Sequence, residues 1–453
     1  GYKSPLDSEK KSISHFFLKF NKDFELPNYL ESNFEAKIEK VSNDTYLKVF
    51  QNNLFWTPVM PGNRDIMQSK ISLDLDHENY NLASGINIYE KLGSKNSDKY
   101  QYVFPYYNFT KSLSIENLNG SLSLTSSGSN NLTNTNNLRT TVTNGIDYNS
   151  IDYISQNGFR NNYGIYFKNS NALGKNDTTY TSRPQIDGMN ILNFESSFPL
   201  IKKEQKINKF ITPKISFRVN PGNNMNNHKG TKKIVNTSNV FDINRLGLSN
   251  TFEAGKSLTF GVDYKFDLLE VNPTKKTKDK FLEFKLATVI RDQYESDIPT
   301  SSTINRKNSN LFGTINNNLF EIINLNYDFS LDNNLKEIES NTIGAEISIN
   351  NFITEFDYIE ERGEIGTSHA LKTSISYNVD ENNIFRFETR RNKEINLTEF
   401  YDLIYEYKND CLVAGIKYNK VFYQDRDLLP SEDLFFTITL IPLTTYEKEL
   451  YKR

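Results

Sequence analysis

The sequence lacks the long apolar runs by which most membrane proteins are recognised. Only 37% of its 453 residues are hydrophobic, and its mean hydropathy is negative. No segment approaches the ~18 consecutive apolar residues of a membrane-spanning helix, and helical spacing of apolar residues is not sustained anywhere. A helical membrane protein is therefore excluded. A transmembrane β-barrel is not excluded, because its strands need an apolar side chain only at every second position.

The usual marks of an enzyme or of a nucleic-acid-binding protein are also missing. The formal net charge is −3, which gives no basic field for nucleic acid. The sequence has no motif for a catalytic nucleophile, for a phosphate-binding glycine loop or for a dinucleotide fold. Its histidines are scattered without metal-ligand spacing, at His15, His77, His228 and His369. We expect no enzyme activity, no cofactor, no metal and no nucleic-acid partner.

One acidic segment is a possible metal site, because carboxylates can attract a divalent cation. It contains five acidic side chains, Glu355, Asp357, Glu360, Glu361 and Glu364. Acidic residues at the end of a strand are more often a solvated rim than a metal site. We therefore assign no metal to this segment.

What the sequence does contain is strict alternation of apolar and polar residues. The clearest run has Ile323, Leu325, Tyr327, Phe329 and Leu331 alternating with Asn324, Asn326, Asp328 and Ser330. The pattern recurs at residues 258–267 and 434–440. In total we expect roughly 20 to 23 strands. Many of them have the length of ~9 to 11 residues with which a tilted strand crosses a bilayer.

These strands predict an all-β fold, a large antiparallel transmembrane β-barrel of the outer-membrane type. The high aromatic content, 13%, suits the aromatic girdles of such barrels. The protein would then be integral to the outer membrane of a Gram-negative bacterium. Alternation alone leaves open a soluble β-sandwich or β-helix, but the expected number of strands is well above what a sandwich holds.

The connections between the strands are of two kinds. Short polar turns such as 332–334 and 380–383 alternate with long polar loops, which we place at 126–150, 169–190, 221–246, 267–280 and 292–309. Short turns at one rim and long loops at the other are typical of outer-membrane barrels. No linker divides the chain and no repeat is present, so we expect one barrel over residues 1–443 and a tail over 444–453.

Several segments resemble the barrel of the LptD family, which assembles lipopolysaccharide in the outer membrane. The segments are VSNDTYLKVF at 41–50, ITPKISFRVNPGNN at 211–224, SNVFDINRLGLSNTFEAGKSLTFGVDYKF at 238–266 and YDLIYEYKNDCLVAGIKYNK at 401–420. The family signature falls on Asn244, Arg245, Gly255, Gly261 and Tyr264. The sequence departs from the family where Asp410 and Leu412 flank Cys411, because the family often has adjacent cysteines in this turn.

The resemblance implies a function, a set of partners and a longer parent chain. Lipopolysaccharide would pass from periplasmic bridge proteins through the barrel lumen and a lateral seam into the outer leaflet. An LptE-like lipoprotein would plug the lumen, and outer-membrane lipid would surround the barrel. The family barrel has about 26 strands, within the known range of such barrels, so the resemblance implies that the first strands and a periplasmic domain precede residue 1. The alternative, from alternation alone, is a general porin or a gated receptor barrel for small solutes; a third is a soluble or surface β adhesin.

The resemblance also gives roles to two features near the end of the chain. A lone cysteine in an oxidising compartment is either buried and idle or one half of a bridge, and spacing leaves both open. By resemblance, Cys411 would form a disulfide with the N-terminal part. The lateral seam would be the last strand, about 432–443, with Leu434, Phe436, Ile438 and Leu440 in a lipid-facing row and Pro442 ending it.

Overall fold

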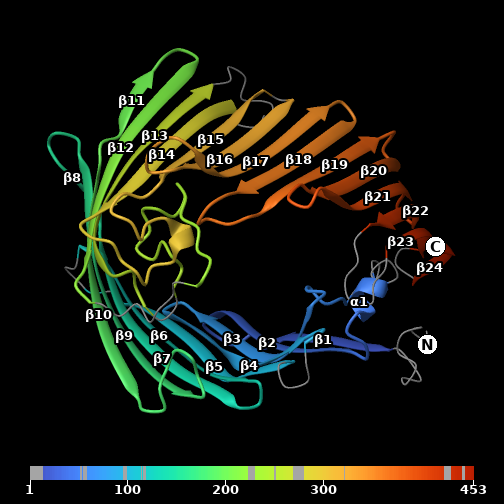
Figure 1. Cartoon of the computed structure of the whole chain (residues 1–453), viewed down its shortest axis with the longest axis horizontal. Helices are drawn as coiled ribbons and strands as arrows, with labels where there is room; N and C mark the ends of the chain where they lie inside the picture. Colours follow the sequence, from blue (N-terminus) through green and yellow to red (C-terminus); the bar gives the residue numbers. More distant parts are fainter. Residues whose placement is uncertain are drawn as a thin grey trace. The chain divides into compact units, whose positions relative to one another are not determined.

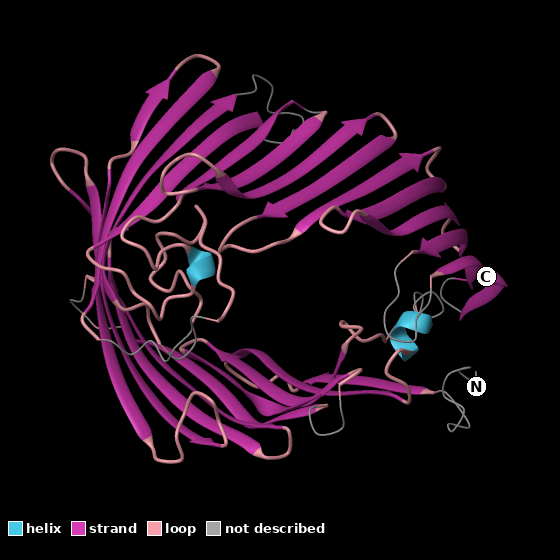
Figure 2. Cartoon of the chain, in the orientation of Figure 1, coloured by secondary structure: helices cyan, strands magenta, loops and turns pink. Residues whose placement is uncertain are grey.

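The structure of the chain consists almost entirely of strands (Figure 2). It is a computed structural model that describes residues 14–50, 54, 59–94, 99–113, 115, 119–222, 230–248, 251–268, 280–320, 322–422, 430–440 and 444–452. Within these residues the helical elements are two short turns, α1 (Tyr46–Val49) and η2 (Thr300–Ser302). In the described part of the chain, no helix has the length and apolar character needed to cross a membrane.

The strands belong to one antiparallel sheet of 24 strands in which neighbours in the chain are, with few exceptions, neighbours in the sheet. Such a meander confirms the predicted fold class, an all-β protein built as a large antiparallel transmembrane β-barrel of the outer-membrane type. The strand count is slightly above the 20 to 23 expected, partly because two strands are very short, β8 (Tyr153–Ile154) and β11 (Leu200–Lys203).

The chain divides into two compact units. Unit 1 comprises residues 1–151, 164–191 and 424–428, and unit 2 comprises 152–163, 192–423 and 429–453, so that β9 (Arg160–Lys175) and β10 (Gln185–Ser197) contribute to both. The other strands of unit 1 are β1 (His15–Asp23), β2 (Tyr29–Val41), β3 (Ile66–His77), β4 (Tyr80–Lys91), β5 (Tyr100–Leu113), β6 (Gly120–Thr133) and β7 (Asn137–Ser150).

All remaining strands lie in unit 2, together with β8 and β11. They are β12 (Ile207–Asn220), β13 (Gly255–Leu268), β14 (Lys280–Arg291), β15 (Leu311–Phe320), β16 (Ile323–Leu331), β17 (Ile338–Ile349), β18 (Phe352–Glu361), β19 (His369–Asn378), β20 (Asn383–Asn392), β21 (Leu397–Lys408), β22 (Leu412–Val421), β23 (Ser431–Leu440) and β24 (Thr444–Lys452). Each pairs antiparallel with the next, from β12 to β24.

One face of the sheet in unit 2 is apolar and exposed; we call it the outward face. Strand register aligns its side chains in rows, of which one runs through Ile211, Tyr264, Phe284, Ile315, Tyr327, Ile343 and Tyr358. A second row joins Phe194, Phe217, Leu258 and Ile290. In that row Phe217 is 47% exposed.

The opposite, inward face of unit 2 is polar, and it is buried where the two long loops cover it. Asn193, Arg218, Ser257 and Arg291 follow one another across four strands, and each is buried. Large apolar side chains on an exposed face, opposite a polar face, invert the arrangement of a soluble protein and suit strands surrounded by lipid. The protein is accordingly an integral protein of the Gram-negative outer membrane, as predicted.

The rims of unit 2 show part of the predicted difference between short turns and long loops, because the loop rim also carries the short connections 332–337 and 393–396. At one rim the connections 204–206, 321–322, 350–351, 379–382 and 409–411 are each at most four residues long. At the other rim lie 221–254 and 292–310, which were predicted as long loops with nearly these bounds. The predicted loop 267–280 joins strands at the short-turn rim, and its residues 269–279 lie outside the described part of the chain.

Two predicted loops are wrong, because their Asn- and Ser-rich segments form strands. Residues 126–150 belong to β6 and β7, and residues 169–190 lie largely in β9 and β10. Side-chain hydrogen bonds support these polar strands: Ser126 donates to Asn144 over 2.8 Å, and Thr140 donates to Asn130 over 2.7 Å. Such cross-strand pairs compensate for the low strand propensity of asparagine.

The end of the chain also differs from the prediction. Residues 444–452, expected to be part of a tail, form β24, which pairs with β23 from Leu440↔Thr444 to Asp433↔Lys452. The strand expected to be the last one, β23, is therefore paired on both edges, to β22 and to β24. Pro442, expected to end it, lies outside the described residues.

Candidate functional site: two loops on the inward face

Two long connections of unit 2 fold back over the inward face of its sheet (Figure 1). They are the β12–β13 loop, residues 221–254, described at 221–222, 230–248 and 251–254, and the β14–β15 loop, residues 292–310. Their apolar side chains form one buried cluster with three inward residues of the sheet, namely Val235, Val240, Leu246, Leu248, Ala254, Ile298 and Ile304 with Ala287, Val289 and Phe312. These three sheet positions are apolar because the loops cover them.

Hydrogen bonds tie the two loops to each other and to the sheet. The backbone N–H of Lys233 donates to Ser301 Oγ over 2.9 Å, and that hydroxyl donates to the Lys233 carbonyl over 3.0 Å. Thr237 and Thr314 share a hydroxyl hydrogen bond of 2.5 Å. The Ser309 N–H donates to the Val289 carbonyl, and the Ser309 hydroxyl accepts from the Val289 N–H, each over 2.9 Å. The loops are thus built into the inward face.

Two glycines allow the β12–β13 loop to lie this close to the wall. A Cβ atom on Gly261 would fall 2.7 Å from the ring of Phe241, so the absence of a side chain leaves room for that ring over β13. Gly255, where the loop joins β13, has φ of +84°, a conformation that other residues rarely adopt. Both positions therefore require glycine for the loop to pack as it does.

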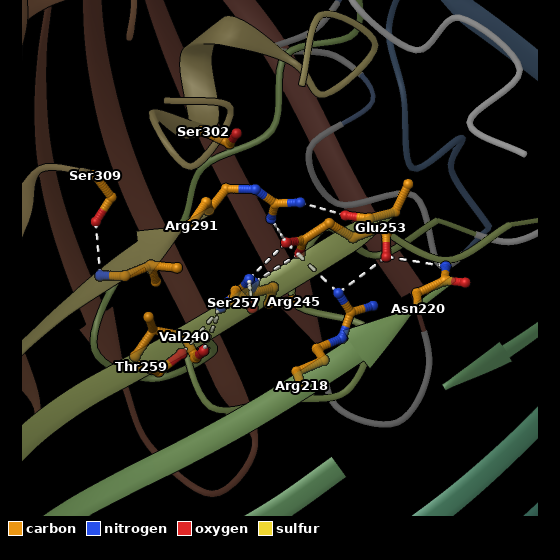
Figure 3. A network of polar contacts seen from close by, with 12 residues as sticks. Arg218, Asn220, Val240, Arg245, Glu253, Ser257, Thr259, Arg291, Ser302 and Ser309 are labelled. Carbon is orange, nitrogen blue, oxygen red and sulfur yellow. Dashed lines mark hydrogen bonds and ion pairs between the residues drawn. The ribbon is translucent and has the colours of Figure 1, made fainter. Parts of the chain in front are cut away.

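The polar centre of the site is a buried carboxylate, Glu253, held by arginines (Figure 3). Arg245, from the same loop, donates from Nε to Glu253 Oε2 over 2.6 Å and from Nη2 to Oε1 over 2.5 Å. Its guanidinium also reaches Ser257 Oγ over 2.9 Å and Thr259 Oγ1 over 3.2 Å on β13. This bidentate pair is the strong form of a carboxylate–guanidinium contact.

Two further arginines reach the same segment from the wall. Arg291 on β14 donates to Glu253 Oε1 and to the carbonyl oxygen of Ala254. Arg218 on β12 donates from Nη1 to the Glu253 carbonyl over 3.0 Å, and Asn220 donates to the same carbonyl over 3.1 Å. The register that aligns Arg218 with Ser257 and Ser257 with Arg291 places both guanidinium groups at this spot. The wall therefore fastens residues 253–254 through both side chain and backbone.

The electrostatics of the cluster fix the charge state of its carboxylate. Burial alone would raise the pKa of Glu253, but the guanidinium groups of Arg245, Arg218 and Arg291 outweigh burial and hold that pKa well below its ordinary value of 4.5. Glu253 is therefore ionised throughout the physiological range. One carboxylate faces three guanidinium groups, so the buried cluster carries an excess of positive charge.

The acidic segment noted in the sequence anchors the loops at a second place. Lys232 Nζ lies 2.6 Å from Glu361 Oε2, and Arg306 Nη2 lies 2.9 Å from Glu364 Oε2. Glu360 pairs with Arg362 beside it. A cavity of about 360 Å³ lies here, lined by Glu360, Glu361, Arg362, Gly363, Gly366, Thr367, His369 and Glu394. Across the described ranges, no three His, Cys, Asp or Glu side chains are grouped to hold a metal ion.

The signature residues named from the sequence lie in or beside the loop assembly. Asn244 closes a turn of the β12–β13 loop through its side chain, which accepts from the Leu248 N–H over 2.9 Å and donates to the Leu248 carbonyl over 2.8 Å. Arg245, Gly255 and Gly261 contribute as described above, and Tyr264 lies on the outward face opposite Phe284. Four of the five thus bear on the position of the loop, a role that the sequence did not reveal.

The other predicted site residues lie apart from the loops. Cys411 is exposed in the β21–β22 turn at the short-turn rim, and its predicted disulfide stays a prediction. Leu434, Phe436, Ile438 and Leu440 alternate on β23 with the buried Asp433, Phe435 and Thr437, and their predicted lipid-facing orientation stays a prediction. The resemblance segment 41–50 forms the end of β2 and α1, where Tyr46 and Leu47 are buried in unit 1 with Met67.

Sequence reasoning missed Arg218, Glu253 and Arg291. Charged residues at alternate positions of a strand are ordinary in a barrel wall, and nothing local marks these three as partners. One signal was present in β14: Leu286, Ala287, Val289 and Ile290 make it apolar on both faces, which indicates that something covers its inward side.

Comparison with known proteins gives distant structural likeness alone. No family model matches the chain, and no curated protein matches it. The ferric enterobactin receptor PfeA of Pseudomonas aeruginosa is 10% identical, with 86% of this chain and 73% of that chain covered and a TM-score of 0.38. The siderophore receptor PirA of Acinetobacter baumannii is 6% identical (84% and 72% covered, TM-score 0.38). The iron transporter FrpB of Neisseria meningitidis is 9% identical (90% and 77% covered, TM-score 0.33).

These findings correct the predicted family. Membership of the LptD family is wrong, because no family model or curated protein matches the chain and the solved structures named above are receptors and transporters of siderophores or iron. The predictions that depended on this family are wrong as well. They are the transport of lipopolysaccharide, the LptE-like plug and the periplasmic bridge proteins.

Proposed function

We propose that the protein is a gated outer-membrane barrel for small solutes, with the two inward loops as its gate. The observation that carries this proposal is the fastening of the β12–β13 loop to the inward wall by Glu253, Arg245, Arg218 and Arg291. Long loops of outer-membrane barrels lie at the extracellular rim. Loops that enter from that rim and cover the inward face stand in the path of a solute.

The anchoring contacts favour a gate over a general open pore. The loops bury an apolar cluster that includes Val289, Ile298 and Ile304, each fully buried. Moving the loops away from the wall would expose these side chains to water and therefore costs free energy. Removing one partner of a buried ion pair leaves the other charge buried and uncompensated, so a single substitution in this cluster can destabilise the closed arrangement.

Liposome swelling with a size series of neutral sugars tests the proposal. Liposomes carrying the wild-type protein should swell slowly, whereas Glu253→Gln, which removes the charge that fastens the loop, should let the smaller sugars enter faster. Heat-dependent migration on a gel serves as the folding control for each variant. Rapid swelling with the wild-type protein would identify an open porin, and equal rates for both proteins would show that these loops are not the gate.

A further inference from the structure

The side chain of Arg218 leaves its best binding edge unused. A guanidinium binds a carboxylate or phosphate side-on through Nε and Nη2, as Arg245 does with Glu253. In Arg218 those two atoms have no hydrogen-bond partner in the described structure, whereas Nη1 is engaged with the Glu253 segment. Arg218 is only 4% exposed, so its free edge does not bond to bulk water either.

Arg291 adds to this imbalance from the neighbouring part of the wall. Its Nε is also buried without a partner among the described residues. Buried polar groups are almost always hydrogen-bonded, and an uncompensated buried charge is costly. The closed arrangement therefore buries two wall arginines that share the Glu253 carboxylate and leave three guanidinium nitrogen atoms unpaired among the described residues.

We propose that these wall arginines bind an oxyanion group of the transported solute, a carboxylate or a phosphate, which takes the place of Glu253. This inference rests on the proposed function and names the class of solute for that gate. In the closed state the Glu253 carboxylate stands in for the solute anion. The solute competes for Arg218 and Arg291, and the β12–β13 loop leaves the wall when the solute replaces Glu253.

The division of the cluster between wall and loop supports this exchange. Glu253 and Arg245 lie on the same loop and form their own bidentate pair, so they can move together without leaving either charge unpaired. Arg218 and Arg291 stay on β12 and β14, separated by two strand spacings, or about 9.5 Å. That distance lets two long side chains converge on one small oxyanion. Gly255, with its positive φ, joins the loop to β13 and is a suitable place for the backbone to turn.

Equilibrium dialysis of labelled inorganic phosphate, and separately of acetate, against the purified full chain in neutral detergent tests the inference. Because Glu253 competes with the anion, Glu253→Gln should bind at least one of the two probes about tenfold more tightly, the effect of roughly one hydrogen bond to a charged group. Adding Arg218→Gln to that variant should remove the gain. Lys265→Gln is the matched control, because it removes a cation from the same face of β13 that pairs with the nearby Asp267 and lies over the Phe281 ring; it should bind as the wild type does.

The outcomes separate this inference from the proposed function. A stronger response to phosphate or to acetate identifies which oxyanion the site takes. An unchanged affinity of Glu253→Gln for both probes, or a gain that persists without Arg218, would overturn the inference. If Glu253→Gln does not fold, Arg218→Gln alone should weaken binding by about the same factor, and unaltered binding would again overturn it. The entry of neutral sugars reports on the gate in the absence of an anion. If Glu253→Gln does not change sugar entry, the proposed gate is contradicted, and dialysis still tests separately whether the wall arginines bind an oxyanion.

Discussion

Each side chain on a spanning strand meets either lipid or the inward face, and adjacent residues meet different environments. Tyr327, at the middle of β16, lies in the outward row between Ile315 and Ile343. Its neighbour Asn326 lies on the inward face and donates to Asn316 over 2.5 Å. A charge at these two positions should therefore have very different costs.

The pair gives a prediction at the residue scale. Tyr327→Lys should lower the free energy of unfolding by about 2 to 4 kcal/mol, because a lysine would face the hydrocarbon near the bilayer midplane. Asn326→Lys should cost much less, because the inward face is polar. Reversible unfolding in denaturant, followed by circular dichroism in lipid vesicles, measures both. If Asn326→Lys proved the more damaging, the two faces assigned here would be inverted.

Glu253 gives a second prediction at this scale, for pH dependence. Its pKa is lower in the folded protein than the ordinary 4.5, so the folded loop binds fewer protons than the released loop at acidic pH. The stabilisation is fully present above pH 4.5 and is lost as the pH falls below it, by about 1.36 kcal/mol per unit. Hydrogen exchange of residues 230–248, corrected for intrinsic rates between pH 3 and 6, should show protection declining below that point.

The Glu253→Gln variant is the control for this titration. Glutamine does not ionise, so the variant should lose protection overall and should lack the decline that the wild type shows below pH 4.5. A wild-type loop whose protection is independent of pH over this range would contradict the role assigned to the carboxylate.

At the scale of elements, the strands with strict alternation were predictable and those made of short polar residues were not. Residues 323–331 form β16 with the predicted bounds, because alternation reports directly on the two faces. Residues 126–150 were taken for a loop because Asn, Ser and Gly favour turns. In β6 and β7 these side chains bond across the strands, and cross-strand partners are invisible in a local segment of sequence.

The contact between the β12–β13 loop and its wall gives a prediction for an element. Gly261→Ala should loosen the loop, because the new Cβ would lie 2.7 Å from the Phe241 ring and 3.1 Å from the Leu286 carbonyl oxygen. Gly344→Ala, on the inward face of β17, is the matched control, since its nearest atom would be Asp357 Oδ1 at 3.8 Å. Hydrogen exchange of residues 236–248 should increase in the first variant alone. Equal exchange in both would mean that Phe241 does not hold the loop.

At the scale of the whole molecule, composition and alternation predicted the class and the membrane, but not the site. The site depends on Arg218, Glu253 and Arg291, which come from β12, a loop and β14 and meet only through the register of the sheet. The resemblance that singled out Arg245, Gly255 and Gly261 selected residues that matter for the loop, yet it attached them to a different function. A single sequence does not show which residues that are distant along the chain become partners in the fold.

Single-channel recording in planar lipid bilayers tests the central claim, that a loop fastened through Glu253 closes the passage. Glu283→Gln is the matched control, since it removes a carboxylate that pairs with Lys285 and accepts from Asn316 on the sheet. The wild type and Glu283→Gln should show low conductance with rare openings, whereas Glu253→Gln should stay open for most of the record. A wild-type channel that is steadily open, or a Glu253→Gln trace that matches the wild type, would contradict the account.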